Sequence, residues 1–287
     1  MDSRVEVMDG RRREARPARA ASVVKRTRPR RTSSVRGAKP ASRPKQGMVA
    51  PAMSPPDVSP APPTPLAVVR VWDLPTRLFH WVLAASVVGS VVTANIGGNA
   101  MPWHFRLGYL AFTLLAFRLL WGFVGGHWSR FASFVPTPGR LLRYVGGRLG
   151  PGERVDIGHN PLGSLSVLAM LALLVAQVST GLVADDEIAH TGPLNRFVAN
   201  ATAQAATAWH KQWGSKLIVA LVVLHVAAIV YYRVGRRLDL VRPMIHGDKL
   251  LPAGVPASAD GARQRLLALA LVIACAAAAA WVASFGG

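Results

Sequence analysis

The sequence predicts an all-α membrane protein built from several spanning helices. Hydrophobic residues make up 51% of the 287-residue chain, and the mean hydropathy is +0.28. These values are typical of integral membrane proteins rather than of soluble domains. Five continuous apolar runs each approach or exceed the roughly 20 residues that a helix needs to cross a bilayer. They cover residues 79–97, 104–124, 162–184, 209–232 and 266–285.

The region before the first apolar run is rich in Arg, Pro, Ser and Ala and has no apolar periodicity. Such a segment buries too little apolar surface to fold alone, so we expect residues 1–66 to form a disordered tail. It contains no apolar h-region, which argues against a cleaved secretory signal. One alternative stays open, namely that the protein starts at Met48 or Met53 and the upstream stretch lies outside it.

The formal net charge of +20 is concentrated in a few segments. Residues 1–47 alone hold 15 Lys and Arg against 4 acidic residues. No aromatic residues alternate with these basic residues, so we expect the tail to be attracted to anionic membrane lipid and expect no nucleic-acid partner.

The connections between the apolar runs differ sharply in charge. Residues 125–158 carry five arginines and 233–265 carry seven basic residues, whereas 98–103 carry none and 185–208 carry one. Basic connections remain on the cytoplasmic side of a membrane. The N-terminus is therefore predicted to be cytoplasmic, with the first, third and fifth helices running outward.

Four histidines lie in or beside the apolar runs, where an imidazole without a partner is costly. His210 and His225 share one run, and 15 residues at about 1.5 Å each separate them by roughly 22 Å along a helix. An ideal helix would leave them about 60° apart in azimuth, so both can face one bundle interior. The predicted orientation pairs His104 with His210 near the outer face and His80 with His225 near the inner face.

Each pair matches the chemistry of b-type haem. Bis-histidine ligation needs two imidazoles that face one another across a bundle interior, one on each side of the porphyrin plane. The single cysteine, Cys275, excludes an intramolecular disulfide, a cysteine cluster for zinc or iron-sulfur, and the covalent attachment of c-type haem. Any haem in this chain must be held non-covalently.

Several motifs resemble the bacterial cytochrome b561 and nickel-hydrogenase cytochrome b family. Residues 71–81 read V-W-D-L-P-T-R-L-F-H-W, and their W-D-x-x-x-R-x-x-H-W spacing is similar to the opening of that family. G-H-N-P-L-G at 158–163 and the dipeptides Trp103-His104, Trp209-His210 and Leu224-His225 fit the same pattern. The resemblance covers about residues 68–250.

The resemblance implies a four-helix transmembrane bundle, placed here at residues 67–250, that holds two b haems. It implies that the axial ligands of the haem iron are His80 with His225 and His104 with His210. Residues 251–287 lie outside it, and we expect them to form a linker and an additional transmembrane helix with no assigned role.

Some polar residues near the histidines have two interpretations. Arg77 lies one turn before His80, and we expect it to pair with a haem propionate rather than to snorkel to lipid phosphate. Arg106 has the same options at the outer haem, whereas Arg118 is expected to snorkel. His159 is expected to cap a helix or to contact a propionate rather than to bind iron.

The expected function is transmembrane electron transfer in the inner membrane of a bacterium. A dihaem b-type cytochrome would connect the quinone pool with a redox partner such as a c-type cytochrome, with quinone oxidoreductase as the enzymatic option. One alternative is a haem-bearing anchor subunit of a hydrogenase- or reductase-like complex. Another is a haem-free transporter whose histidines bind metal, which the continuous apolar runs disfavour. The sequence leaves the electron donor, the acceptor and homo-oligomer formation open.

Overall fold

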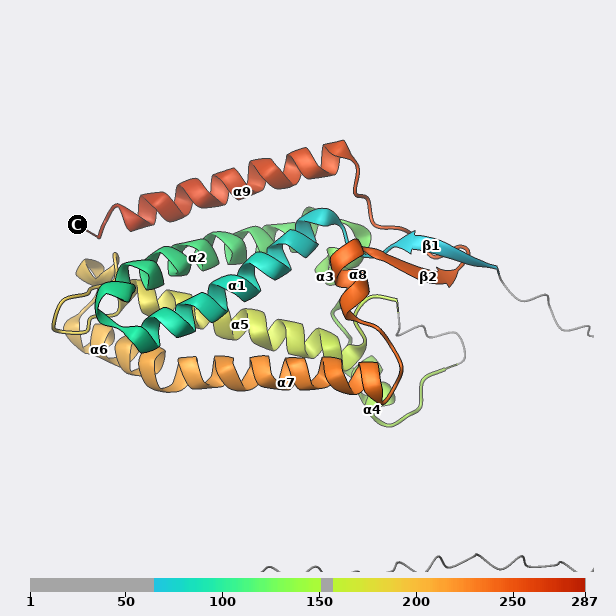
Figure 1. The fold of residues 1–287 in the computed structure, drawn as a ribbon, viewed down its shortest axis with the longest axis horizontal. Helices are drawn as coiled ribbons and strands as arrows, with labels where there is room; N and C mark the ends of the chain where they lie inside the picture. Colours follow the sequence, from blue (N-terminus) through green and yellow to red (C-terminus); the bar gives the residue numbers. More distant parts are fainter. Residues whose placement is uncertain (1–64, 151–156, 287) are drawn as a thin grey trace, which may run out of the picture. The chain divides into compact units, whose positions relative to one another are not determined.

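The computed structural model describes residues 65–150 and 157–286, and its long helices run side by side (Figure 1). Five of its helical spans are long and apolar enough to cross a membrane, which confirms the predicted all-α membrane fold and each of the five predicted spans. They are α1 (Leu74–Ile96), α2 (Met101–Val124, preceded by a 3₁₀ turn), α5 (Pro161–Val183), α6 with α7 (Asn200–Ala208 and Ser215–Val234) and α9 (Ala262–Ala283).

Short elements gather at one end of the bundle, which we call the strand end. They are α3 (Phe131–Phe134), α4 (Pro138–Val145), α8 (Val241–His246), β1 (Leu66–Arg70) and β2 (Asp248–Pro252). The two strands pair antiparallel, with Leu66 opposite Pro252 and Arg70 opposite Asp248. The opposite end, formed by residues 97–100 and 184–199, is the loop end.

The strands cross the boundaries that the sequence placed at residues 66 and 250. Leu66, the last residue of the proposed tail, belongs to β1, and residues 1–64 of the tail lie outside the described residues. Two five-residue strands are too short to stand out from a hydropathy profile, because their apolar residues merge with those of the neighbouring helices.

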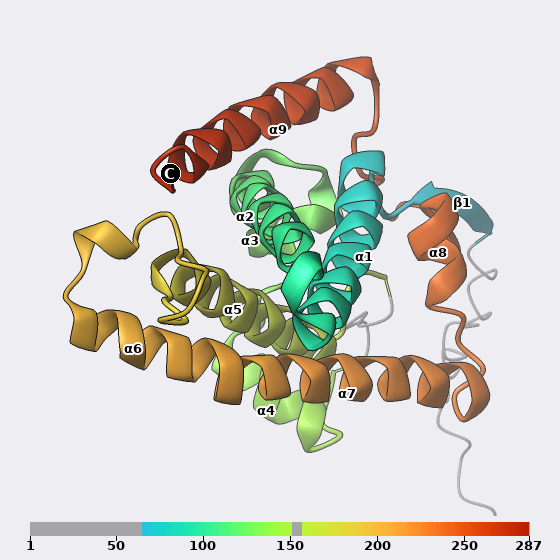
Figure 2. The same cartoon turned by 60° about the vertical axis from the view of Figure 1, so that its left-hand side comes forward.

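The helices pack as neighbours in a defined order. Helix α1 lies along α2, α2 also contacts α5 and α9, and α5 contacts the α6–α7 helix. Figure 2 shows α9 on the side of α2 that faces away from α7. The buried residues of α9 are small and lie on one face, at Ala268, Cys275 and Ala279, which lets its backbone approach α2 closely. The fifth helix is thus a peripheral element of the bundle.

The fourth span has two features that its hydropathy does not predict. It begins at Asn200, before the apolar run, because Asn200–Ala208 is rich in alanine and forms a helix without being strongly apolar. Between α6 and α7, Trp209–Gly214 forms a π-helix. Such wide turns are uncommon and frequently occur at functional sites. His210 lies in this segment.

Asp73 joins the start of α1 to the end of α2. It is fully buried and caps α1, with Oδ1 accepting hydrogen bonds from the Thr76 N–H at 2.8 Å and from Trp121 Nε1 at 3.2 Å. Its Oδ2 accepts from the Gly126 N–H at 3.2 Å and from Ser129 Oγ at 2.6 Å. This arrangement explains the aspartate in the W-D motif, because a buried carboxylate is stable only when its oxygens are satisfied.

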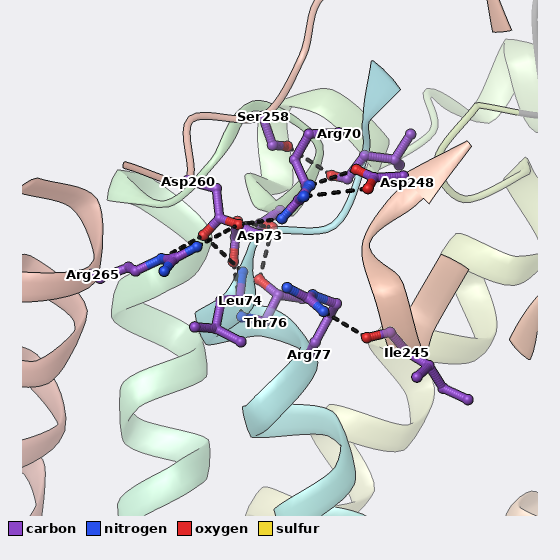
Figure 3. Close-up of polar contacts among 12 residues, drawn as sticks. Arg70, Asp73, Leu74, Thr76, Arg77, Ile245, Asp248, Ser258, Asp260 and Arg265 are labelled. Carbon is purple, nitrogen blue, oxygen red and sulfur yellow. Dashed lines mark hydrogen bonds and ion pairs between the residues drawn. The ribbon is translucent and has the colours of Figure 1, made fainter. Parts of the chain in front are cut away.

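A second polar network anchors α9 at the strand end (Figure 3). Arg70 on β1 forms ion pairs with Asp248 on β2 and with Asp260, which precedes α9. Asp260 also accepts a hydrogen bond from the Leu74 N–H at 3.0 Å and pairs with Arg265. Burial raises the pKa of the Asp260 carboxyl, but the hydrogen bonds from Leu74, Arg265 and Arg70 outweigh it and hold the pKa below its ordinary value.

The Asp73 network predicts a large loss of stability for Asp73→Ala. The substitution leaves three buried donors without an acceptor, because, of the four donors, only the Ser129 hydroxyl has a second partner, Thr76 Oγ1 at 2.8 Å. We expect it to lower the free energy of unfolding by roughly 2–4 kcal/mol. Asp73→Asn keeps one acceptor oxygen and should lose less. Chemical denaturation followed by circular dichroism in detergent measures both, with exposed Glu187→Ala as the control. Unfolding of Asp73→Ala at the wild-type denaturant concentration would contradict the role of this network.

Candidate paired-histidine site

The histidine pair nearer the strand end joins α1 and α7. The rings of His80 and His225 face each other, with centroids 6.5 Å apart and planes at 53°. Nδ1 of His80 is buried and has no hydrogen-bond partner among the described residues. An uncompensated imidazole nitrogen inside an apolar bundle is costly, so this atom stands out among the polar groups of α1.

The second pair, nearer the loop end, joins α2 and the π-helix. The rings of His104 and His210 have centroids 6.0 Å apart and planes at 87°. Nδ1 of His104 lies 3.0 Å from the Ser90 carbonyl oxygen, and Nδ1 of His210 lies 2.9 Å from that of Gln177. A carbonyl only accepts, so Nδ1 of each neutral ring carries the proton and Nε2 keeps its lone pair. Histidines that bind metal ions are commonly oriented in this way.

Helix α5 positions His210 from two sides. The backbone carbonyl of Gln177 accepts from the ring, and its side-chain Nε2 donates to the His210 carbonyl at 3.0 Å. One turn later, a Cβ atom at Gly181 would lie 2.8 Å from Cε1 of the His210 ring. Glycine at 181 therefore lets the ring approach α5. Neither residue stands out in the sequence, because both roles depend on the helix packing and on the π-helix.

The geometry of both pairs fits a metal centre between two imidazoles. An iron about 2 Å from one nitrogen of each ring needs ring centroids roughly 6 Å apart. The observed separations of 6.0 and 6.5 Å meet this requirement. In the described part of the chain, no group of three or more His, Cys, Asp or Glu side chains is placed to hold a metal ion. Two axial imidazoles suit a haem, whose other four ligands are porphyrin nitrogens, better than a bare ion.

Two arginines lie at the strand end of the site. Nη1 of Arg77 donates to the Ile245 carbonyl, while its Nε is buried and has no hydrogen-bond partner within 65–150 and 157–286. The expectation that Arg118 snorkels to lipid is wrong, because this residue is 3% exposed and packs against the rings of Phe131 and Phe134. Helix α3 covers its side chain, an arrangement that the sequence does not reveal.

The G-H-N-P-L-G motif forms the start of α5. Asn160, rather than His159, caps the helix, since its Oδ1 accepts from the Gly163 N–H at 2.7 Å. Asn160 Nδ2 also donates to the Tyr232 hydroxyl at 2.8 Å, which ties α5 to the end of α7. The ring of His159 lies between those of Trp72 and Phe134, at 4.8 and 5.0 Å. Burial, with the nearby charges of Arg118 and Lys249, lowers the pKa of His159 to about 3.

The acidic loop at the loop end is held together by its own hydrogen bonds. The carboxylate of Asp186 accepts from the backbone N–H groups of Ile188, Ala189 and His190. These bonds, led by that of His190, hold the pKa of Asp186 well below its usual range. The His190 ring stacks on Phe105, next to His104 in the chain. The loop therefore borders the loop-end pair, and in the described residues it adds no third side chain placed to hold a metal ion.

Five spanning helices and two facing histidine pairs define a helical membrane protein of the haem-cytochrome class. Comparison with known families agrees, since residues 71–247 match the model of the prokaryotic cytochrome b561 family. The chain belongs to this family, whose members are electron-transfer proteins with b-type haem. No solved structure matches the chain significantly.

Several curated relatives have similar sequences. A probable Ni/Fe-hydrogenase B-type cytochrome subunit from Bradyrhizobium diazoefficiens is 26% identical, over 63% of this chain and 85% of the relative. A protein of the same description from Azotobacter chroococcum is 28% identical, over 63% and 88%. A probable Ni/Fe-hydrogenase 1 B-type cytochrome subunit from Escherichia coli is 24% identical, over 39% and 57%.

Proposed function

We propose that this cytochrome holds two b haems and carries electrons across a bacterial inner membrane. His80 and His225 are the axial ligands of one haem, and His104 and His210 are those of the other. The observation that carries the proposal is the facing of two separate ring pairs at centroid distances of 6.5 and 6.0 Å. Each haem supplies a one-electron iron couple when it is bound.

The chain's own residues hold the ligands in place. The Ser90 and Gln177 carbonyls accept from the Nδ1–H groups of the loop-end pair, which fixes the tautomer and raises the basicity of Nε2. The buried Nε of Arg77, one turn before His80, is available to a propionate of the strand-end haem. With two histidines holding each iron, no position would be open to oxygen, so the bound haems would supply electron transfer rather than oxygen chemistry.

Single ligand substitutions should remove one haem at a time. His225→Ala should abolish the strand-end haem and leave much of the loop-end haem, whereas His210→Ala should do the reverse. A pyridine haemochrome assay and a redox titration of the purified variants measure the haem content and assign each potential. The exposed His246 and the loop-end His190 offer matched controls, since His246→Ala and His190→Ala keep all four proposed ligands. Variants His225→Ala and His210→Ala with full haem content would refute this ligand assignment.

The family and the relatives support a proposal for the redox partners. We propose the quinone pool as one partner and a protein at the opposite face as the other. The names of the relatives favour a Ni/Fe-hydrogenase-like complex as that protein, in which the chain is the haem-bearing membrane subunit. Purification from native membranes in mild detergent distinguishes an anchor subunit of a complex from a free-standing protein. A stable complex with hydrogenase-like subunits supports the anchor role, and an isolated chain reduced by quinol supports a free-standing quinone oxidoreductase.

We also propose that the strand end faces the cytoplasm. The two basic connections, 125–158 and 233–265, both meet at this end, and basic connections remain inside. In α4, the exposed Leu142 and Val145 accompany Arg140 and Arg143, a combination that suits the membrane interface. The loop end and its acidic residues then face the periplasm.

This orientation predicts an external C-terminus. With five spans and a cytoplasmic N-terminus, alkaline phosphatase fused after Gly287 should be active, because that enzyme needs the oxidising periplasm to form its disulfides. A fluorescent protein that folds only in the cytoplasm should stay dark at the same position. The reverse pattern would show that α9 does not cross the membrane or that the whole orientation is inverted, and a fusion after Gly150 separates these two cases.

A further inference from the structure

Arg118 is a buried cation with no ion-pair partner in the described part of the chain. It is 3% exposed, although it lies within the apolar helix α2. Its Nη1 is buried, and among the described residues it has no hydrogen-bond partner. The guanidinium carbon lies 5.1 and 5.8 Å from the ring centroids of Phe131 and Phe134. Attraction to two ring faces is weaker than the hydration that a buried charge loses, so this site is incomplete without an anion.

Among the described residues, 65–150 and 157–286, no acidic side chain fills this role. Asp73 is close enough to attract Arg118 electrostatically, but it forms no ion pair with it in the described residues. Both oxygens of Asp73 are already used by the four donors that join α1 to α2. The phosphate of a lipid is also a poor candidate, because the aromatic rings of α3 cover the guanidinium.

Helix geometry places Arg118 beside the strand-end histidine pair. It follows His104 by 14 residues, a rise of roughly 21 Å, and a rotation of about 1400° leaves it on nearly the same face of α2 as His104. His225 follows His210 by 15 residues, a rise of roughly 22 Å in a helix that runs in the same direction. Because His104 faces His210, Arg118 and His225 lie at similar depths.

A shared neighbour supports this placement. The buried His159 ring lies within electrostatic range of Arg118 and of both His225 and His80. The guanidinium and the ring pair thus border the same part of the interior.

We propose that Arg118 binds a propionate carboxylate of the haem held by His80 and His225. This inference rests on the proposed function. A guanidinium fork matches a carboxylate with two parallel hydrogen bonds, and a propionate reaches a buried site because the porphyrin carries it there. Arg118 thereby compensates the negative charge of the propionate, which the apolar bundle would otherwise exclude. Its positive charge also raises the reduction potential of that haem, because it disfavours the extra positive charge of the ferric state.

The test compares haem potentials in matched variants of the full chain. Redox titration of Arg118→Gln should show a lower potential for the strand-end haem and an unchanged potential for the loop-end haem. The control is Arg233→Gln, since Arg233 lies at the same end but is exposed and paired with Asp239. It should leave both potentials unchanged. An unchanged strand-end potential in Arg118→Gln overturns the proposal.

Esterified haem identifies the anion. In protein reconstituted with haem dimethyl ester, the propionates carry no charge, so the difference between wild type and Arg118→Gln should largely disappear. A difference of the same size with both haems shows that Arg118 interacts with another anion, such as a lipid phosphate, and overturns the proposal.

A further variant covers the case in which Arg118→Gln does not assemble. Arg118→Lys keeps the charge but loses the fork, and with isotope-labelled propionates the infrared carboxylate band of the strand-end haem should shift relative to wild type and Arg233→Gln. An unshifted band overturns the proposal. If the wild-type protein holds two haems but the Arg118 variants change neither the strand-end potential nor the carboxylate band, only this inference is refuted. If the wild-type protein holds no b haem, the proposed function is refuted as well.

Discussion

The arrangement of this bundle depends on one constraint, that a single helix must present two histidines to two different neighbours. The α6–α7 helix offers His210 to His104 on α2 and His225 to His80 on α1. An ideal α-helix would leave the two rings about 60° apart, and the π-helix at Trp209–Gly214 changes this angle beside His210. It also changes the local hydrogen bonding, and Gln177 Nε2 donates to the His210 carbonyl. The packing of α5 against the α6–α7 helix is thus coupled to the position of the His210 ring.

Polar groups inside the bundle are subject to a second constraint. Lipid offers no hydrogen bonds, so each buried donor or acceptor needs a partner from the protein or from a bound group. Asp73 meets this rule with four donors, and Asn160 meets it by capping α5 and binding Tyr232. Among the described residues, buried nitrogens without a hydrogen-bond partner occur toward both ends, in Arg77, His80, Arg118 and His159 near the strand end and in Gln204 and Trp209 near the loop end. Each end therefore has polar groups that a bound group would satisfy.

The sequence predicts the spans and the histidine pairs for clear physical reasons. Long apolar runs determine the helices. The charge of the connecting loops assigns a depth to each histidine, and matching depths pair His80 with His225 and His104 with His210, as the ring contacts confirm. Features that depend on side-chain packing were not predictable. The burial of Arg118 depends on α3, the role of Gly181 depends on the approach of α5, and the pairing of β1 with β2 joins residues that are far apart in the chain. Haem ligation by these residues remains a prediction.

The haem content of the intact protein tests the central claim most directly. Pyridine haemochrome analysis of the purified wild-type chain, set against a protein concentration from amino-acid analysis, counts b haems per polypeptide. The account predicts two, both low-spin because each iron has two imidazole ligands. One haem per well-folded chain would show that one of the two ring pairs binds no iron, and none would contradict the account of the paired-histidine site.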